Sequence, residues 1–369
     1  MRGLHDTVAR LSTLRREAAQ GSPANDGRLA DIGGFGSNPG KLRGLLHVPE
    51  GLEPGAALVV VLHGCTQTAA LYDRGAGWSE LADRQGFAVL YPEQARANNS
   101  NLCFNWFAPR DARRGKGEAL SIRQMITATV AAHGLDAARV YVTGLSAGGA
   151  MTAVMLATYP EVFAGGAVIA GLPFATANSV PEALERMRGS GGPGEQRLAE
   201  IAADASRYAG PWPTLAVWHG TADHVVVPSN ADDIVAQWRG LTGIGEAPAK
   251  EQAVNGHVRR VWLDGAGREA IEQYVIAGTG HGVPLDTRGK GGCGEAGPHM
   301  LEAGICSTRT IARSWELLTE REAKAEPDRV TRIDAPRQAA ARPSIARPNA
   351  RPGVAEVIDN ALRAAGLMR

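Results

Sequence analysis

The sequence lacks a net charge that would draw it to a charged polymer. Its 369 residues hold 39 basic and 38 acidic side chains, well mixed along the chain, and the formal net charge is +1 at pH 7. This balance leaves no electrostatic footprint for nucleic acid, so we expect no nucleic-acid partner. The sequence also lacks any run of 18 apolar residues, and we therefore predict no membrane-spanning helix.

A secretory signal is likewise not recognisable at the N-terminus. Asp6, Arg10, Arg15 and Arg16 interrupt the apolar positions of residues 1–20, so no apolar signal-peptide core is present. The spacing of the leucines and the valine among these charges favours a short amphipathic helix packed on the body of the protein.

Cysteine is scarce, and the four residues present have no metal-binding pattern. Cys65, Cys103, Cys293 and Cys306 match no zinc spacing and no C-x-x-C redox pair, so we predict neither a metal nor another cofactor. Two disulfides would suit an exported protein, whereas four free thiols would suit a cytoplasmic one. The even cysteine count and the missing signal thus point to different compartments.

Short apolar runs alternate with helical segments along most of the chain. The predicted helices include 77–86, 118–132 and 150–159, with a further Gly/Pro-interrupted helical region over 173–210. The predicted strands are 42–47, 58–62, 87–93, 140–143, 165–171, 213–220, 258–264 and 271–278. This alternation predicts an α/β fold with a mostly parallel central sheet and helices on both faces.

Changes in composition divide the chain into four predicted parts. Residues 1–41 form a helical or irregular extension, and 42–322 form a single domain that contains the sheet. Residues 323–353 hold five prolines and six arginines with few large apolar residues, which is typical of a flexible linker. Residues 354–369 place their apolar side chains on one helical face, which could dock on its own domain, a partner or a polymer surface.

A serine between two glycines stands at the turn from a predicted strand to a predicted helix. Residues 140–143 (VYVT) indicate a buried strand, and 150–159 have helix-forming composition. Gly144 and Gly148 carry no Cβ, so neighbouring backbone can approach closely and Ser146 can occupy a strained conformation. This G-x-S-x-G arrangement in a strand–turn–helix context predicts a nucleophilic serine.

A nucleophilic serine needs a base, which is usually a histidine oriented by a carboxylate. Asp223 and His281 each follow the end of a predicted strand, in the chain order serine, acid, histidine that α/β-hydrolases use. The carboxyl ends of the strands form the edge at which ligands bind in open α/β sheets. We therefore predict a Ser146–Asp223–His281 triad.

Other acids and histidines compete for these two roles. Asp232 and Asp233 fall inside the next predicted helix, where they would be solvated. His219 is interpreted as a hydrogen-bonded loop histidine, and His257 precedes a strand. His299 follows Pro298 and is placed at the start of a helix.

An acyl-transfer site also needs donors for the oxyanion of its tetrahedral intermediate. One donor should be the N–H group of Ala147, the residue after the nucleophile. The other should come from the loop after residues 58–62, where Cys65 follows Gly64 and supplies the N–H group. His63 in this loop is predicted to make structural hydrogen bonds.

Five segments together resemble the esterases of the poly(3-hydroxybutyrate) depolymerase family. They are LHGCTQ (62–67), CFNWF (103–107), RVYVTGLSAGGAM (139–151), HGTAD (219–223) and GTGHGVP (278–284). The resemblance runs from about residue 42 to 318. It implies an α/β-hydrolase fold, a triad at Ser146, Asp223 and His281, and hydrolysis of short-chain hydroxyalkanoate esters or of acyl groups such as ferulate.

The same resemblance implies a disulfide between Cys65 and Cys103, which leaves Cys293 and Cys306 as a second pair. It also implies an extracellular or periplasmic enzyme, with a cytoplasmic one as the alternative. The secreted polymer degraders of this family carry a signal peptide and usually a polymer-binding domain, and neither is visible here. The alternative functions are a feruloyl or acetylxylan-type esterase and a non-catalytic protein that binds polymer granules.

Overall fold

The computed structural model describes residues 27–288, 292–319 and 330–332. The predicted N-terminal helix, the predicted C-terminal helix and most of the predicted linker lie outside these residues. Two short strands fall in ranges predicted as extension or linker. They are β1 (Ala30–Ile32) and β13 (Val330–Arg332), and each pairs with one edge of the central sheet.

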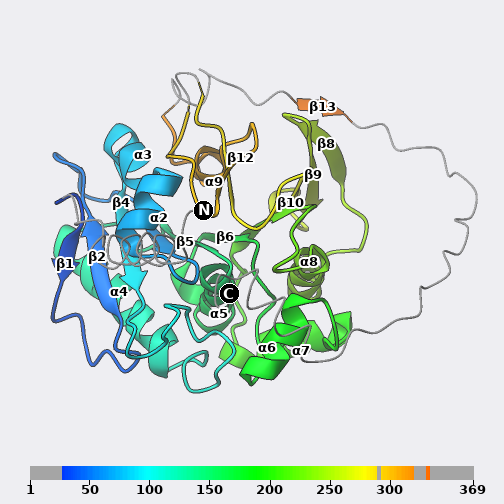
Figure 1. The fold of residues 1–369 in the computed structure, drawn as a ribbon, viewed down its shortest axis with the longest axis horizontal. Helices are drawn as coiled ribbons and strands as arrows, with labels where there is room; N and C mark the ends of the chain where they lie inside the picture. Colours follow the sequence, from blue (N-terminus) through cyan, green and yellow to red (C-terminus); the bar gives the residue numbers. More distant parts are fainter. Residues whose placement is uncertain (1–26, 289–291, 320–329, 333–369) are drawn as a thin grey trace, which may run out of the picture.

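The described residues form one large mixed sheet of eleven strands (Figure 1). Its order is β1-β2-β4-β3-β5-β6-β7-β10-β9-β8-β13. The remaining bounds are β2 (Arg43–His47), β3 (Leu58–Leu62), β4 (Ala88–Glu93), β5 (Val140–Leu145), β6 (Gly165–Ile169), β7 (Thr214–Gly220), β8 (Lys250–Val254), β9 (His257–Leu263) and β10 (Glu269–Ile276).

The six central strands, from β4 through β3, β5, β6 and β7 to β10, run parallel to one another. This confirms the predicted fold class. The outer strands on both sides are antiparallel. On one side, β8, β9 and β10 are consecutive strands joined by short hairpins, which are too short for the crossover that a parallel pair needs. Strand β8 was missed, since its sequence KEQAV has little apolar character and only Val254 among its residues is buried.

Helices cover both faces of the sheet, as Figure 1 shows. One face carries α2 (Ala69–Ala76), α3 (Trp78–Gln85) and α9 (Ser307–Ser314). The other carries α4 (Gly117–His133), α5 (Ala147–Thr158), α6 (Val180–Met187), α7 (Glu195–Ser206) and α8 (Ser229–Thr242). A short 3-10 helix, η1 (Pro160–Val162), follows α5, and a separate pair is formed by β11 (Val283–Leu285) and β12 (Met300–Glu302).

The central strands are buried on both faces, which explains their continuous apolar sequences. All five residues of β3 (LVVVL) are buried, and their side chains alternate between the two hydrophobic clusters. Burial of one such valine or leucine side chain contributes about 1.5–3 kcal/mol. The sheet is therefore a rigid base for the loops that leave its carboxyl edge.

One buried carboxylate lies beneath the loop that contains CFNWF. Glu118, at the start of α4, is 1% exposed. It accepts hydrogen bonds from the Gln94 side chain (2.6 Å), the Asn105 N–H group (2.8 Å) and the Asn105 side chain (2.7 Å). Burial raises the pKa of Glu118 to about 7, although these hydrogen bonds act in the opposite direction.

This buried carboxylate should make the stability of the protein depend on pH. Glutamate in the unfolded chain ionises near pH 4.5, so between that pH and 7 the folded state binds the extra proton. The free energy of unfolding should fall by up to about 3 kcal/mol over this range and level off above it. Urea unfolding at pH 5 and pH 8 should show a smaller fall for Glu118→Gln than for the wild type.

The exposed Glu80 of α3 gives the matched control, since Glu80→Gln should keep the wild-type pH dependence. An equal fall in the wild type and in Glu118→Gln would contradict the role of this carboxylate.

Candidate active site

Ser146 lies at a sharp turn between the central strand β5 and helix α5. Its φ of 56° and ψ of −117° are unusual for a residue with a side chain, and such a conformation costs about 1–3 kcal/mol. A hydrogen bond of 2.9 Å from the Ser146 N–H group to the Ile169 carbonyl holds the turn against β6. The serine side chain is half-buried at the carboxyl edge of the sheet.

Gly148 allows the first turn of α5 to pack directly on the end of β3. A Cβ at this position would overlap the Leu62 carbonyl oxygen and would lie 2.5 Å from the His63 carbonyl oxygen. A Cβ at Gly144 would meet the backbone of Gly148 at a similar distance. The two glycines of the motif are therefore needed for close backbone packing around Ser146.

Asp223 and His281 are joined by a short hydrogen bond. Asp223 Oδ2 lies 2.7 Å from His281 Nδ1, and the carboxylate is 1% exposed. Its Oδ1 accepts from the N–H groups of Val225 and Val226, both at 2.9 Å. Burial alone would raise the pKa of Asp223, but the hydrogen bonds from His219, His281 and Val226 outweigh it and lower that pKa, so the carboxylate stays ionised.

The loops that carry these two residues are bound to each other. The Ala222 N–H group donates to the Thr279 carbonyl (3.0 Å), and the Gly278 N–H group donates to the Thr221 hydroxyl (2.9 Å). A Cβ at Gly220 would overlap the Thr279 carbonyl oxygen. The last residue of β7 must therefore be glycine for the histidine loop to pass this close to it.

The predicted oxyanion loop is fixed beside the serine turn. Leu62 at the end of β3 pairs with Gly144 of β5, and a disulfide joins Cys65 to Cys103. His63 is buried, receives a hydrogen bond at Nε2 from the Gln94 N–H group (3.1 Å) and donates from Nδ1 to the Gly64 carbonyl (2.8 Å). Burial lowers the pKa of His63 and keeps it neutral. It is the structural histidine that we expected.

A second group of contacts holds the backbone at His281. The His299 side chain donates from Nδ1 to the His281 carbonyl (3.1 Å), and the Val283 N–H group donates to the His299 carbonyl (2.8 Å). The rings of His281 and His299 lie edge to face with centroids 5.8 Å apart. His299 therefore lies in a turn before β12, with a φ of 61°, and the prediction that it opens a helix is wrong.

The second disulfide, Cys293–Cys306, encloses β12, which pairs with β11 directly after His281. Both disulfides thus have the pairing that the resemblance implied. Each fixes a segment that contacts one of the predicted catalytic loops.

The structure brings Asp223 and His281 together and places Ser146 at the same edge of the sheet. Ser146 follows β5, Asp223 follows β7 and His281 follows β10, and these strands are parallel. Within the described part of the chain, the Ser146 hydroxyl makes no direct hydrogen bond to His281. Such bonds often shorten only when substrate is bound.

Comparison with known proteins identifies the family. Residues 45–260 match the family described as esterase PHB depolymerase. The poly(3-hydroxyalkanoate) depolymerase C of Paucimonas lemoignei is 44% identical over 296 residues, which cover 79% of this chain and 70% of that protein. The chain belongs to the esterase PHB depolymerase family.

Other relatives of this esterase act on different esters, as their names state. Feruloyl esterase B of Talaromyces stipitatus is 32% identical over 267 residues, 70% of this chain and 73% of that protein. The solved structure of the acetyl xylan esterase of Aspergillus awamori aligns with a TM-score of 0.67 and 26% identity, covering 78% of this chain and 99% of that one. The chain is a carboxylesterase with an α/β-hydrolase fold. None of the helices in the described ranges is long and apolar enough to cross a membrane.

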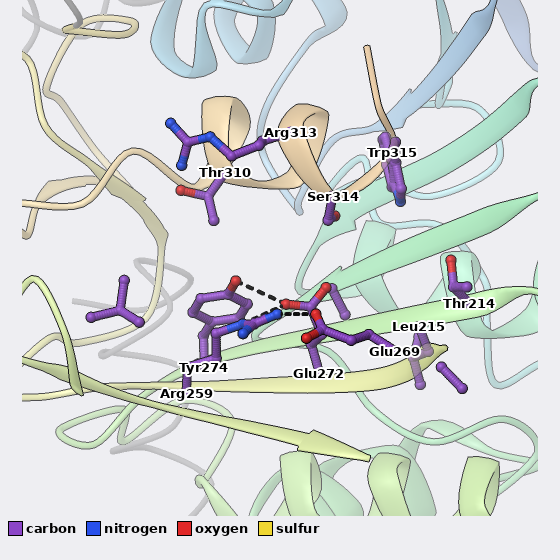
Figure 2. A pocket seen from close by; sticks show the side chains of 13 residues that line it. Thr214, Leu215, Arg259, Glu269, Glu272, Tyr274, Thr310, Arg313, Ser314 and Trp315 are labelled. Carbon is purple, nitrogen blue, oxygen red and sulfur yellow. Dashed lines mark hydrogen bonds and ion pairs between the residues drawn. The ribbon is translucent and has the colours of Figure 1, made fainter. Parts of the chain in front are cut away.

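A cavity of about 340 Å³ in this esterase is lined by residues of α9, β7, β9 and β10 (Figure 2). Because it includes the first residues of β7 and β10, it lies at the opposite end of these strands from Asp223 and His281, which follow their last residues. Its charged groups bind one another, since Arg259 pairs with Glu269 and with Glu272 (2.8 Å) and the Tyr274 hydroxyl donates to Glu272 (2.9 Å). Because these side chains already pair with one another, they do not need a charged ligand as a partner.

Sequence reasoning missed three residues that shape the site. Gly220 was visible only as part of HGTAD, and nothing local shows that another loop crosses it. The sequence indicates only that His219 makes hydrogen bonds and assigns His299 no contact, whereas the structure places His219 beside Asp223 and His299 beside His281. His219 and Gly220 could have been noted because they belong to HGTAD beside Asp223, whereas no feature of the sequence near His299 points to His281.

The close contact at Gly220 predicts a specific loss of activity. In Gly220→Ala the new Cβ should push the His281 loop away from its position, and a displacement near 1 Å can cost about 100-fold in rate. We expect kcat for p-nitrophenyl acetate to fall by about that factor with KM little changed. The matched control is Gly265→Ala, in the turn between β9 and β10, where an added Cβ meets open space. Wild-type kcat in both variants would contradict the proposed packing.

Proposed function

We propose that the esterase hydrolyses carboxylic esters through Ser146, His281 and Asp223, with an acyl-enzyme intermediate. The observation that carries this proposal is the 2.7 Å hydrogen bond between the buried, ionised Asp223 and His281. A carboxylate only accepts hydrogen bonds, so the proton lies on His281 Nδ1. That leaves Nε2 unprotonated and able to act as a base.

In the first half of the proposed reaction, the Ser146 hydroxyl attacks the ester carbonyl carbon while His281 Nε2 takes its proton. The tetrahedral intermediate then collapses, the bond to the alcohol breaks, and His281 returns the proton to the departing oxygen. In the second half, a water molecule attacks the acyl-enzyme in the same way and releases the carboxylic acid and free Ser146.

The proposed oxyanion donors are the N–H groups of Ala147 and Cys65. Ala147 is the first residue of α5, so its N–H group has no acceptor within the helix and lies at the positive end of the helix dipole. In the described part of the chain, the Cys65 N–H group donates to no hydrogen-bond acceptor. Each such donor contributes about 3–4 kcal/mol to transition-state stabilisation in hydrolases of this type.

For the substrate we propose a poly- or oligo(3-hydroxybutyrate)-type short-chain hydroxyalkanoate ester. The support is the 44% identity to a poly(3-hydroxyalkanoate) depolymerase, against 32% to a feruloyl esterase. A feruloyl or acetylxylan-type ester is the second candidate. A granule-binding protein without catalysis has no use for an ionised Asp223 directed at His281, so this alternative is disfavoured.

We further propose that residues 42–322 are the catalytic domain, with β1 and β13 added to the two edges of its sheet. An oxidising compartment, extracellular or periplasmic, fits this domain because disulfides persist there. The two disulfides among the described residues support this assignment.

A substrate panel with active-site variants tests the proposal. Hydroxybutyrate oligomers, methyl ferulate and p-nitrophenyl acetate should all be assayed, with the highest kcat/KM for the oligomers. Ser146→Ala should lose several orders of magnitude in kcat on every ester, because the members of a triad act as a unit. The exposed Ser229 gives the control variant Ser229→Ala, which should keep full activity.

Equal activity of Ser146→Ala and the wild type would overturn the assignment of Ser146 as the nucleophile. A preference for methyl ferulate would instead overturn only the proposed substrate class.

A further inference from the structure

We propose that His219 is a positioning residue that fixes Asp223 in the orientation His281 requires. This inference rests on the proposed triad, and it assigns a specific role to a histidine that the sequence indicates only as a hydrogen-bonded residue. His219 is the penultimate residue of β7, four positions before Asp223, and it is 4% exposed.

The proton of the His219 ring can be placed from its contacts. Its Nε2 lies 2.8 Å from the Val226 carbonyl oxygen and 3.3 Å from Asp223 Oδ2. Both oxygens can only accept hydrogen bonds, so Nε2 must carry the proton. Within the described residues the buried Nδ1 has no hydrogen-bond partner. His219 therefore acts as a donor through Nε2.

The contacts of His219 fix both the carboxylate and the turn that holds it. The Val226 carbonyl accepts from His219, and the Val226 N–H group donates to Asp223 Oδ1. Asp223 Oδ2 lies between the two imidazoles, 3.3 Å from His219 and 2.7 Å from His281. Four donors thus surround a carboxylate that has about four acceptor sites. Loss of His219 would therefore remove the hydrogen bond at the Val226 carbonyl and, at the same time, one of the two donors at Asp223 Oδ2.

The unpartnered Nδ1 argues against a role in packing alone. A buried acceptor without a hydrogen bond destabilises the folded state, and a leucine of similar size would avoid that penalty. Only the donor at Nε2 distinguishes histidine from such an apolar residue here.

Removal of this donor should also change the response to pH. Among the described residues, the titratable groups that contact Asp223 are His219 from β7 and His281 from the loop after β10, while Asp223 and His299 contact His281. Without the His219 donor, the charge of Asp223 acts more strongly on His281 and favours its protonated form. The acid limb of the kcat/KM profile should therefore move to higher pH.

Three variants test the proposal. In His219→Gln the side-chain amide can place a donor where Nε2 lies, whereas His219→Leu has no donor and His219→Asn is too short. For p-nitrophenyl acetate we expect His219→Leu and His219→Asn to lose about 10- to 100-fold in kcat, less than the roughly 10⁴-fold that loss of a triad carboxylate costs. KM should stay nearly unchanged, and the acid limb should move upward. His219→Gln should retain most of the activity and the wild-type acid limb.

Circular dichroism and urea unfolding show whether each variant is folded. If His219→Leu does not fold, the comparison of His219→Gln with His219→Asn tests the proposal. Equal loss in the Gln and Asn variants, or losses without movement of the acid limb, would overturn the positioning role. Labelling of wild-type Ser146 by a fluorophosphonate tests the triad separately. Absence of that labelling would overturn the proposed function itself.

Discussion

The arrangement of the candidate active-site loops depends on the burial of one charge, the Asp223 carboxylate. An ionised group removed from water must be surrounded by donors, and here Val225, Val226, His219 and His281 supply them. Two of these donors are backbone groups of the turn after β7, and the others come from β7 and from the loop after β10. The requirements of the carboxylate thus connect two loops that lie far apart in the sequence.

Each remaining part of the site is fixed to the sheet or to a disulfide. Ser146 is held by close backbone packing between α5 and the end of β3, and the Cys65–Cys103 disulfide restrains the loop that follows β3. The Cys293–Cys306 disulfide encloses the strand that lies beside the His281 segment. This site therefore depends on preformed geometry, which lowers the cost of reaching a charged transition state.

Local features of the sequence were sufficient to predict the fold class and the candidate triad. The G-x-S-x-G turn is encoded by residues that are adjacent in the chain, and Asp223 and His281 were found because each follows an apolar strand. Contacts between distant segments were not predictable in this way. The crossing of Thr279 over Gly220 and the position of His299 beside His281 depend on how β7, β10 and β12 are placed. The polar strand β8 was missed because its sequence KEQAV carries no apolar pattern, although it pairs with β9 in the sheet.

The rate of covalent labelling by a fluorophosphonate in Asp223→Asn tests the central role of this carboxylate most directly. The measurement needs no knowledge of the natural ester, because the probe reports only the reactivity of the serine. An asparagine keeps the size of the side chain but removes its charge and disturbs the proton position on His281, as in other triads. We expect labelling at Ser146 to be slower by several orders of magnitude in a variant that is folded like the wild type. A wild-type labelling rate in Asp223→Asn would contradict the account.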